Sequence, residues 1–529
     1  MCQDTNIPCI AKRCARLGRY FCGSISLKLG DNCYISLYPI FYAMYTNPVS
    51  WSLLTDLYQL TMAYGYWKSD KGEQEAVFNL FFRRNPFKGG YAIACGLVPV
   101  LDFLNNFRVD ASDIAYLASL KGNDGQALFE QGFLDYLAAM KFTCSIEAIP
   151  EGTVVFPHEP LFRITGPLIQ CQLIETPMLN IVNFQTLIAT KAARVVQATK
   201  GEQVLEFGLR RAQGADGGLA ASRAAYIGGC HATSNVLAGK MYDIPVRGTH
   251  AHSWVMSFDT ELEAFETYAS VMPNNCVFLV DTYDTLEGVK QAIAVGQKLR
   301  EKGYRMAGIR LDSGDLAYLS IEARKLLDAA GFQEANIVAS NDLDEYTVES
   351  LKMQDAQINV WGIGTKLVTA YDQPALGGVY KIAAIRNAAG AWDYKVKLSE
   401  QSIKISNPGI QQVRRFYQEG ECIGDMIYHI EQPLPQEGYT IIDPMDMTRR
   451  KQISADTAWE DLLVPVLVQG KAVYTPPSIH ETRQRTATQL ASFHAGIKRF
   501  SNPHSYPVGL EQSLFEQKMQ IIMQLKGLA

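Results

Sequence analysis

The stretch CVFLVDTYDTLEGVKQAIAVGQKLREKGYRMAGIRLDSGD, residues 276–315, contains one strand–helix–strand unit. A short apolar, β-prone run ends at Val280, and a second run begins at Met306. Apolar residues recur at helical spacing over residues 286–299, and Gly303 supplies a stop signal after them. Both runs are followed directly by polar residues. The stretch therefore predicts a parallel βα unit with functional groups at the ends of its strands.

The same alternation of apolar run and amphipathic helix repeats through the middle of the chain, at spacings of roughly 25 to 30 residues. Such a repeat is typical of a parallel sheet, either open or closed into a barrel, and we favour the barrel. The predicted strands are residues 204–207, 244–247, 276–280, 306–311, 336–339 and 359–361.

Polar residues follow the predicted strands rather than preceding them. In a parallel α/β barrel these ends converge on one face, so residues far apart in sequence would meet in one pocket. Capping of the following helices is an alternative explanation, and it accounts for Asp284 and Asp342 equally well. The strand-end residues are Thr249 and His252, Asp281 and Thr282, Arg310 with residues 312–315, residues 340–342 and residues 362–365.

The composition predicts a soluble globular protein, since 47% of the 529 residues are hydrophobic and 19% are charged. A net charge of -5 does not favour binding to nucleic acid. The best apolar run, residues 34–44, is too short to span a bilayer and contains Pro39, so we expect no membrane segment. The eleven cysteines include no CxxC pair, which fits a reducing compartment, and we expect a cytoplasmic protein.

The chain is expected to divide into four segments. Residues 1–50 lack clear periodicity and predict an extension, from an over-extended start or, alternatively, an organelle-targeting leader. Residues 51–185 predict an N-terminal α/β domain, and residues 186–385 the catalytic barrel. Residues 386–529 predict a C-terminal segment that packs on the N-terminal domain.

Two segments suit a phosphorylated sugar and an acidic co-substrate. Gly362, Gly364 and Thr365 follow a β-run, where backbone N–H groups and a hydroxyl can approach a phosphate. Arg310 can pair with a carboxylate, and the acidic groups of residues 312–315 can hold Mg²⁺ or sugar hydroxyls. An ordinary glycine turn and a surface ion pair are the alternatives that the residues alone leave open.

The segment His250-Ala251-His252 admits two interpretations. Two histidines two positions apart at a strand end can bind a catalytic metal, as in barrel hydrolases. Such a site needs further ligands from other strands, and none of the other six histidines falls at a predicted barrel strand end. Two histidines near a turn, without a metal, are the second interpretation.

A series of segments in order along the chain resembles the nicotinate phosphoribosyltransferases, from about residue 52 to 510, while residues 1–50 have no counterpart. The matching motifs are LLTDLYQLTM at residues 53–62, FFRRNPF with GG at 81–90, EFGLRRAQG at 206–214, GTHAHS at 248–253, LVDTYD at 279–284, RLDSGD at 310–315, SNDLD at 340–344, GIGT at 362–365, and NPH with YPV at 502–508.

This resemblance implies an irregular parallel α/β barrel of the type II phosphoribosyltransferase kind, flanked by an α/β domain made from both terminal segments. It also implies transfer of 5-phosphoribosyl from 5-phosphoribosyl 1-diphosphate to nicotinate, coupled to ATP hydrolysis and dependent on Mg²⁺, in NAD biosynthesis. ATP would phosphorylate His252, and Asp281 would orient the imidazole by a hydrogen bond.

The resemblance further implies a set of binding residues. Phe207 would stack on the pyridine ring, Arg310 would pair with its carboxylate, and Thr249 would add a hydroxyl contact. Tyr58 would close the ring pocket from the neighbouring subunit of a homodimer. The phosphoribosyl diphosphate would contact Gly362, Gly364 and Thr365, with Arg210 and Asp315 nearby and Asp315 a candidate for Mg²⁺.

Other functions stay open from the sequence. A nicotinamide or a quinolinate phosphoribosyltransferase is the nearest alternative, because all three acceptors are pyridines. A barrel metallohydrolase using His250 and His252, or a homologue that binds ligand without turnover, are alternatives from other classes.

Overall fold

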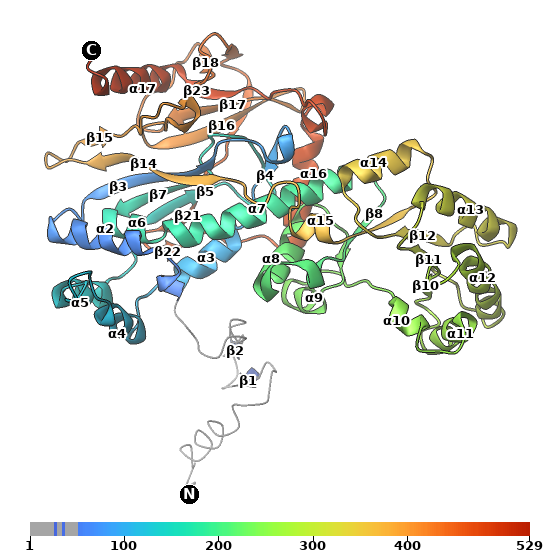
Figure 1. Ribbon diagram of the computed structural model, residues 1–529. Helices are drawn as coiled ribbons and strands as arrows, with labels where there is room; N and C mark the ends of the chain where they lie inside the picture. Colours follow the sequence, from blue (N-terminus) through green and yellow to red (C-terminus); the bar gives the residue numbers. More distant parts are fainter. Residues whose placement is uncertain (1–25, 29–33, 37–50, 529) are drawn as a thin grey trace, which may run out of the picture. The chain divides into compact units, whose positions relative to one another are not determined.

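The computed structural model describes residues 26–28, 34–36 and 51–528 (Figure 1). The chain divides into two compact units, Met1–Trp51 and Ser52–Ala529. In the first unit β1 (Ser26–Lys28) pairs antiparallel with β2 (Tyr34–Ser36). The rest of the extension predicted over residues 1–50 lies outside the described residues, and the second unit carries the candidate site.

A six-stranded parallel sheet forms one end of the second unit, in the order β10-β11-β12-β13-β8-β9. This confirms the predicted α/β fold, with one difference: β9 and β10 lie at opposite edges, so the sheet is a half-barrel rather than a closed barrel. The strands are β8 (Gln203–Glu206), β9 (Ala232–Thr233), β10 (Val277–Leu279), β11 (Gly308–Leu311), β12 (Asn336–Ala339) and β13 (Val360–Ile363).

The prediction of a strand at residues 244–247 is wrong. The run forms only an isolated bridge between Val246 and Thr233, while the short β9 takes the edge position. Pro245 lies in the middle of the run and has no N–H to donate, so a longer ladder cannot form there.

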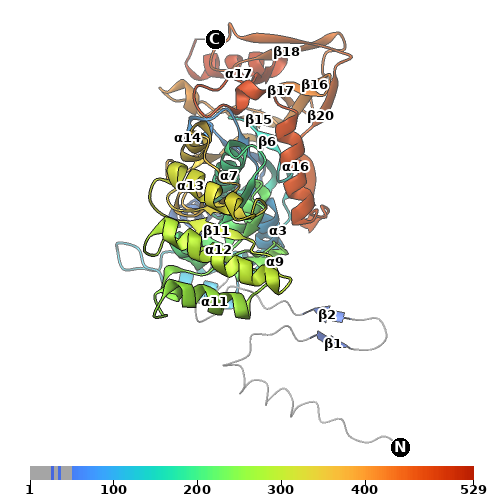
Figure 2. The same cartoon turned by 90° about the vertical axis from the view of Figure 1, so that its right-hand side faces the viewer.

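Helices follow the strands and cover the sheet, and Figure 2 shows α11, α12 and α13 in front of β11. Gly303 and Gly331 have φ of 79° and 78°, so the predicted stop signals are left-handed turns just beyond the helix ends. The helices are α8 (Gly214–Ile227), α9 (Val236–Tyr242), α10 (His252–Val255), α11 (Glu261–Val271), α12 (Thr285–Glu301), α13 (Leu316–Ala329), α14 (Glu345–Met353) and α15 (Thr365–Val368).

An antiparallel sheet and a mixed sheet, in which β17 and β23 pair parallel, form the other end of this unit (Figure 1). The seven-stranded sheet has the order β15-β14-β3-β7-β5-β21-β22, and the six-stranded sheet has the order β19-β18-β23-β17-β16-β20. The first consists of β3 (Glu75–Phe82), β5 (Ser145–Ala148), β7 (Phe162–Pro167), β14 (Gly378–Arg386), β15 (Trp392–Tyr394), β21 (Val464–Val468) and β22 (Lys471–Ala472). The second consists of β16 (Gln411–Gln418), β17 (Glu421–His429), β18 (Gly438–Ile442), β19 (Arg450–Ser454), β20 (Ala458–Asp461) and β23 (Val508–Glu511).

The antiparallel sheet combines strands from both ends of the chain. Its β5 pairs with β7 on one side and with β21 on the other, so segments from both ends of the chain share one sheet, while β14 begins before residue 386, inside the segment predicted as the barrel. Beside it, α2 (Leu57–Lys68) and α6 (Leu168–Leu173) contribute to an apolar cluster around Phe133. No helix among the described residues is long and apolar enough to cross a membrane.

The 24-residue helix α7 (Glu175–Ala198) connects the two ends of the unit. It packs on α8 and α14 of the half-barrel and also on β14 and β4 (Ala92–Ile93) of the antiparallel end. Most of its second half is buried, including Lys191 and Arg194. Charged residues at such positions require partners inside the protein.

Candidate active site

Arg310 lies at the end of β11 and is the centre of a polar cluster. Its Nε donates to Ser340 Oγ at 2.8 Å, Nη1 donates to Thr249 Oγ1 at 3.0 Å, and Nη2 donates to Asp312 Oδ1 at 2.9 Å. Its guanidinium carbon lies 5.9 Å from the centre of the Phe207 ring. The structure therefore brings together the three residues predicted for a pyridine carboxylate: Phe207, Thr249 and Arg310.

Gly362 makes room for the Phe207 ring. A Cβ atom at Gly362 would lie 2.7 Å from Phe207 Cδ2, well inside van der Waals contact. The backbone N–H of Phe207 donates to Ile363 O at 2.8 Å, which holds the ring against β13. Gly364 immediately precedes α15, and Thr365 is its first, half-buried residue. The predicted phosphate loop is therefore adjacent to the aromatic pocket.

His252 begins α10, and its side chain is 38% exposed. Its Nδ1 is hydrogen-bonded to Thr282 Oγ1 at 3.1 Å, while Nε2 lies 3.8 Å from Asp312 Oδ2 and 4.0 Å from Asp281 Oδ1. The hydrogen bond predicted between Asp281 and His252 is therefore not formed, and Thr282, which follows Asp281 in the chain, occupies that place.

Asp281 has a different partner because it holds the turn after β11. Its Oδ2 accepts from Asp312 N at 2.8 Å and from Ser313 Oγ at 2.7 Å. Its other oxygen, Oδ1, is buried without a hydrogen-bond partner and faces Nε2 of His252. Asp281 thus fixes the neighbouring strand end and keeps one acceptor free on the histidine side.

Glu261, the first residue of α11, was not predicted as part of the site. Burial raises the pKa of its carboxyl to about 7, and the nearby charge of Asp281 adds to this rise. Its Oε1 is buried without a partner. A carboxyl next to another buried carboxylate cannot be recognised from sequence, because the two residues lie on different elements.

His250 is a core residue. Its Nε2 accepts from Leu279 N at 3.3 Å, its ring packs against Phe265 and Tyr268, and burial lowers its pKa to about 4. Among the described residues no group of three or more His, Cys, Asp or Glu side chains is placed to hold a metal ion. The geometry gives no support to the metal interpretation of the His250-Ala251-His252 segment.

Three predicted residues are not joined to this cluster. Arg210 lies exposed in η3 (Leu209–Arg211). Asp315 is also exposed, and it caps α13 by accepting from Tyr318 N at 3.1 Å. Tyr58 is 51% exposed on α2, which lies on the opposite side of the second unit from α10 (Figure 1).

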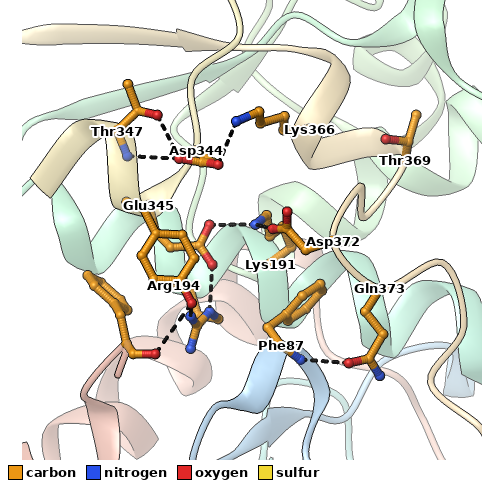
Figure 3. Close-up of polar contacts among 12 residues, drawn as sticks. Phe87, Lys191, Arg194, Asp344, Glu345, Thr347, Lys366, Thr369, Asp372 and Gln373 are labelled. Carbon is orange, nitrogen blue, oxygen red and sulfur yellow. Dashed lines mark hydrogen bonds and ion pairs between the residues drawn. The ribbon is translucent and has the colours of Figure 1, made fainter. Parts of the chain in front are cut away.

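A buried network of charged residues joins α7 to the segments that follow β12 and β13 (Figure 3). Lys191 Nζ lies 2.6 Å from Glu345 Oε2 and 2.5 Å from Asp372 Oδ2, and Arg194 Nε lies 2.7 Å from Glu345 Oε1. Lys191 and Glu345 are completely buried. The network ties α7 to the start of α14 and to the loop after α15.

A second ion pair in Figure 3 joins α14 to α15 directly. Lys366 Nζ donates to Asp344 Oδ2 at 2.8 Å, while Asp344 Oδ1 accepts from Thr347 N and caps α14. Burial opposes the charge on Asp344, but the hydrogen bonds from Lys366 and Thr347 outweigh it and lower the pKa of Asp344. The only local signal for this network in the sequence is two cations in an apolar helix.

The fold and the strand-end residues define a class of protein: an α/β half-barrel with a histidine between two carboxylates, next to a pocket of one aromatic ring and one guanidinium. Family models for nicotinate phosphoribosyltransferase match nearly the whole second unit. The N-terminal domain model matches residues 53–183, the family model residues 203–415 and the C-terminal domain model residues 410–518.

Known relatives agree with these matches. The nicotinate phosphoribosyltransferase of Bacillus subtilis is 45% identical over 482 residues, covering 90% of this chain and 96% of that protein. The human nicotinate phosphoribosyltransferase is 36% identical over 519 residues, covering 87% and 95%. The chain belongs to the nicotinate phosphoribosyltransferase family, which confirms the resemblance of its motifs.

Solved structures support the same fold. The crystal structure of human nicotinic acid phosphoribosyltransferase is similar with a TM-score of 0.78 at 33% identity, covering 88% of this chain and 99% of that one. A nicotinate-nucleotide pyrophosphorylase from Pyrococcus furiosus has a TM-score of 0.64 at 20% identity, covering 83% and 95%, and is similar in fold.

Proposed function

We propose that this chain transfers the 5-phosphoribosyl group of 5-phosphoribosyl 1-diphosphate to nicotinate, with ATP hydrolysis coupled to the transfer. The products are nicotinate mononucleotide and diphosphate, on the route from nicotinate to NAD. The observation that carries this proposal is the pocket of Phe207, Thr249 and Arg310, joined by the hydrogen bond from Arg310 to Thr249 and the ring contact with Phe207.

The pocket suits an aromatic acid. The Phe207 ring offers a face for a pyridine, and the guanidinium of Arg310 suits a carboxylate through charge-assisted hydrogen bonds. A nicotinamide has no charge to pair with this guanidinium. Quinolinate has two carboxylates, and the set Phe207, Thr249, Ser340 and Arg310 contains one cation. Nicotinate therefore fits this pocket best.

The transfer itself needs charge stabilisation more than a general base. Positive charge develops at C1 of the ribose while the diphosphate leaves, and the pyridine nitrogen already has a lone pair for attack. Gly362, Gly364 and Thr365 would hold the phosphate beside the ring pocket, and Arg210 would approach the diphosphate from the solvent side.

Mg²⁺ fits this site only with substrate oxygens as its main ligands. Asp315 uses Oδ1 to cap α13 and has its second carboxylate oxygen left for a cation, and the free Oδ1 of Asp281 is a further candidate. When bound, Mg²⁺ would neutralise charge on the leaving diphosphate. Asp315 and Asp281 would then orient the metal-bound substrate rather than enclose the metal.

His252 would accept the γ-phosphoryl group of ATP. Its Nδ1 is hydrogen-bonded to Thr282, so Nε2 is the nitrogen left to act as the nucleophile, and a partly exposed ring can meet a nucleotide. Because Nε2 must keep its lone pair for the attack, Asp281 would orient His252 indirectly, by holding the strand end next to Thr282, whose hydroxyl is hydrogen-bonded to Nδ1.

A homodimer would complete the pocket with Tyr58 from the second subunit. Tyr58 lies with Leu54 and Leu57 in one exposed apolar stretch, their exposed fractions being 51%, 42% and 53%. Exposed apolar side chains gathered on one segment are typical of a protein interface.

A substrate assay tests the acceptor. The purified full chain is incubated with nicotinate, nicotinamide or quinolinate, each with 5-phosphoribosyl 1-diphosphate and Mg²⁺, with and without ATP. We expect mononucleotide from nicotinate, with more product per minute when ATP is present. Product from nicotinamide but not from nicotinate would overturn the proposal.

Labelling tests the phosphorylated residue. Incubation with [γ-³²P]ATP should give a label on the wild type that is labile in acid and stable in base, and His252→Ala should carry none. His250→Gln is the matched control, because His250 lies two residues away and faces the core. A label that persists in His252→Ala would refute the assignment.

A further inference from the structure

Asp312 connects the acceptor pocket to His252. One carboxylate oxygen, Oδ1, accepts from Arg310 Nη2 at 2.9 Å and from the Ser340 hydroxyl. The other oxygen, Oδ2, faces His252 Nε2 at 3.8 Å. Among the described residues, Asp312 is the one side chain that is hydrogen-bonded to Arg310 and also lies within 4 Å of a ring nitrogen of His252.

The main chain of Asp312 is held while its side chain has room to move. Its N–H donates to Asp281 Oδ2 at 2.8 Å, which anchors the backbone to the next strand end. The carboxylate is 28% exposed, in contrast to the 1% exposure of the Asp281 side chain. A change of charge at His252 would therefore act on the position of this carboxylate and not on the strand.

Arg310 is already paired before any substrate arrives. Burial works against the charge on Asp312, but hydrogen bonds from Ser340 and Arg310 lower the pKa of its carboxyl, so it is an anion at neutral pH. In this arrangement the carboxylate of Asp312 competes with the carboxylate of nicotinate for the same guanidinium.

We propose that Asp312 couples the phosphorylation of His252 to the affinity for nicotinate, an inference that rests on the proposed function. In the phosphorylation step, the Nε2 lone pair forms a bond to the γ-phosphorus of ATP. The bond from that phosphorus to the bridging oxygen breaks, ADP leaves with the electron pair, and Nδ1 keeps its proton toward Thr282, so the ring becomes a cation. The new phosphoryl group carries close to two negative charges, which gives the modified side chain a net negative charge, and its oxygens lie beside Asp312 Oδ2.

Repulsion between these anions moves the Asp312 carboxylate away and releases Nη2 of Arg310. Nη2 can then bind the carboxylate of nicotinate, while Ser340 and Thr249 still hold the other nitrogens of the guanidinium. A charge-assisted hydrogen bond gained in this way corresponds to a fall in the Kd for nicotinate of about 10- to 100-fold.

A purely structural role for Asp312 makes the opposite prediction. If the carboxylate only held Arg310 in its rotamer, Asp312→Asn would weaken nicotinate binding with and without ATP. If it acts as a competitor that phosphorylation displaces, Asp312→Asn binds nicotinate tightly without ATP, because the amide carries no charge to hold the guanidinium.

Equilibrium dialysis with radiolabelled nicotinate distinguishes the two, using the full chain with Mg²⁺, with and without ATP, and without 5-phosphoribosyl 1-diphosphate. We expect ATP to lower the Kd of the wild type about 10-fold or more, and Asp312→Asn to have the low Kd in both conditions. Asp312→Glu keeps the charge and should regain the response to ATP. Asp284→Asn is the matched control: Asp284 caps α12 after the neighbouring strand, and asparagine preserves that cap.

The labelling experiment on the same samples separates this inference from the proposed function. A wild type that takes no label would overturn both the phosphohistidine and the coupling. A labelled wild type whose Kd does not respond to ATP would overturn the coupling alone. So would an Asp312→Asn variant that keeps the response or binds more weakly without ATP; its Kd without ATP can be read even if the variant is labelled poorly.

Discussion

Each polar residue at the strand ends has a partner set by its immediate surroundings. The sequence predicted that Phe207, Thr249 and Arg310 would meet, and they do: β8, which Phe207 directly follows, and β11, which carries Arg310, lie in one parallel sheet, and Thr249 follows the isolated bridge of Val246 beside β9. The hydrogen bond predicted between Asp281 and His252 is not formed in this structure: Asp281 Oδ2 accepts from Asp312 N and Ser313 Oγ, while Oδ1 lies 4.0 Å from His252 Nε2.

At Gly362 the absence of a side chain sets the position of an aromatic ring. In Gly362→Ala the new methyl would lie 2.7 Å from Phe207 Cδ2, so the ring must move out of the acceptor pocket. We expect KM for nicotinate to rise about 10-fold or more, with a smaller change in KM for 5-phosphoribosyl 1-diphosphate. Steady-state kinetics check this. Gly217→Ala is the control, since a Cβ there meets no atom within 4 Å, and equal changes in both KM values would contradict the argument.

Glu261 should make stability depend on pH. In the folded protein its pKa is about 7, above the value of 4.5 for a free glutamate. The folded state therefore binds the proton more tightly than the unfolded state, and the free energy of unfolding is highest below pH 4.5 and falls as the pH rises through about 7. Glu261→Gln removes this dependence. We expect the variant to gain on the order of 1 kcal/mol over the wild type between pH 5 and pH 8. Urea unfolding at both pH values measures it, and a difference that stays constant or reverses would count against a protonated Glu261.

At the scale of elements, buried charges hold the strand-end loops in place. Helix α7 meets α14 through Lys191, Arg194 and Glu345, and α14 meets α15 through Asp344 and Lys366. One of these residues, Lys366, directly follows the predicted phosphate loop in the chain. Of these helices the sequence predicted only α14, after the strand at residues 336–339, and it did not predict the pairs, whose partners are separated by about 150 residues in one case.

Removing one cation from this network should be costly. Lys191→Met leaves the fully buried Glu345 with one cation fewer and the partly exposed Asp372 without its partner, and we expect a loss of about 3 to 5 kcal/mol in unfolding free energy. Because α14 and the loop after α15 lose a common anchor, KM for 5-phosphoribosyl 1-diphosphate should rise as well. Chemical unfolding and kinetics test both effects.

Lys290→Met is the control for this change. Lys290 pairs with Glu287 on the surface of α12, where both side chains are more than half exposed, and an exposed pair contributes about 0 to 1 kcal/mol. Equal losses of stability in the two variants would show that burial of the Lys191 pair has no special effect.

At the scale of the whole molecule, the proposed pocket requires a second subunit. Tyr58 on α2 and Arg310 on β11 lie at different ends of the second unit, so one chain cannot place both in one pocket without a large rearrangement (Figure 1). A twofold dimer can do so, with each subunit supplying Tyr58 to the other.

Co-expression of two inactive variants tests this arrangement. Tyr58→Ala and Arg310→Ala should each have little activity alone. With random pairing about half of the dimers contain one subunit of each variant, and each mixed dimer has one intact site and one site that lacks both residues. Co-expression should therefore restore about a quarter of the wild-type activity. Activity that stays at the level of the single variants would mean that Tyr58 and Arg310 act in the same chain or that Tyr58 has no role in the pocket.

The sequence by itself determined the parallel βα units and the residues that follow each strand, because helical and strand periodicity and the motifs between them are local properties. It also identified the family. Only the tertiary structure decided that the sheet remains a half-barrel, that Thr282 rather than Asp281 is hydrogen-bonded to His252, and that Asp312 stands between His252 and Arg310. These outcomes depend on distances between elements that are far apart in the chain, and no local pattern contains those distances.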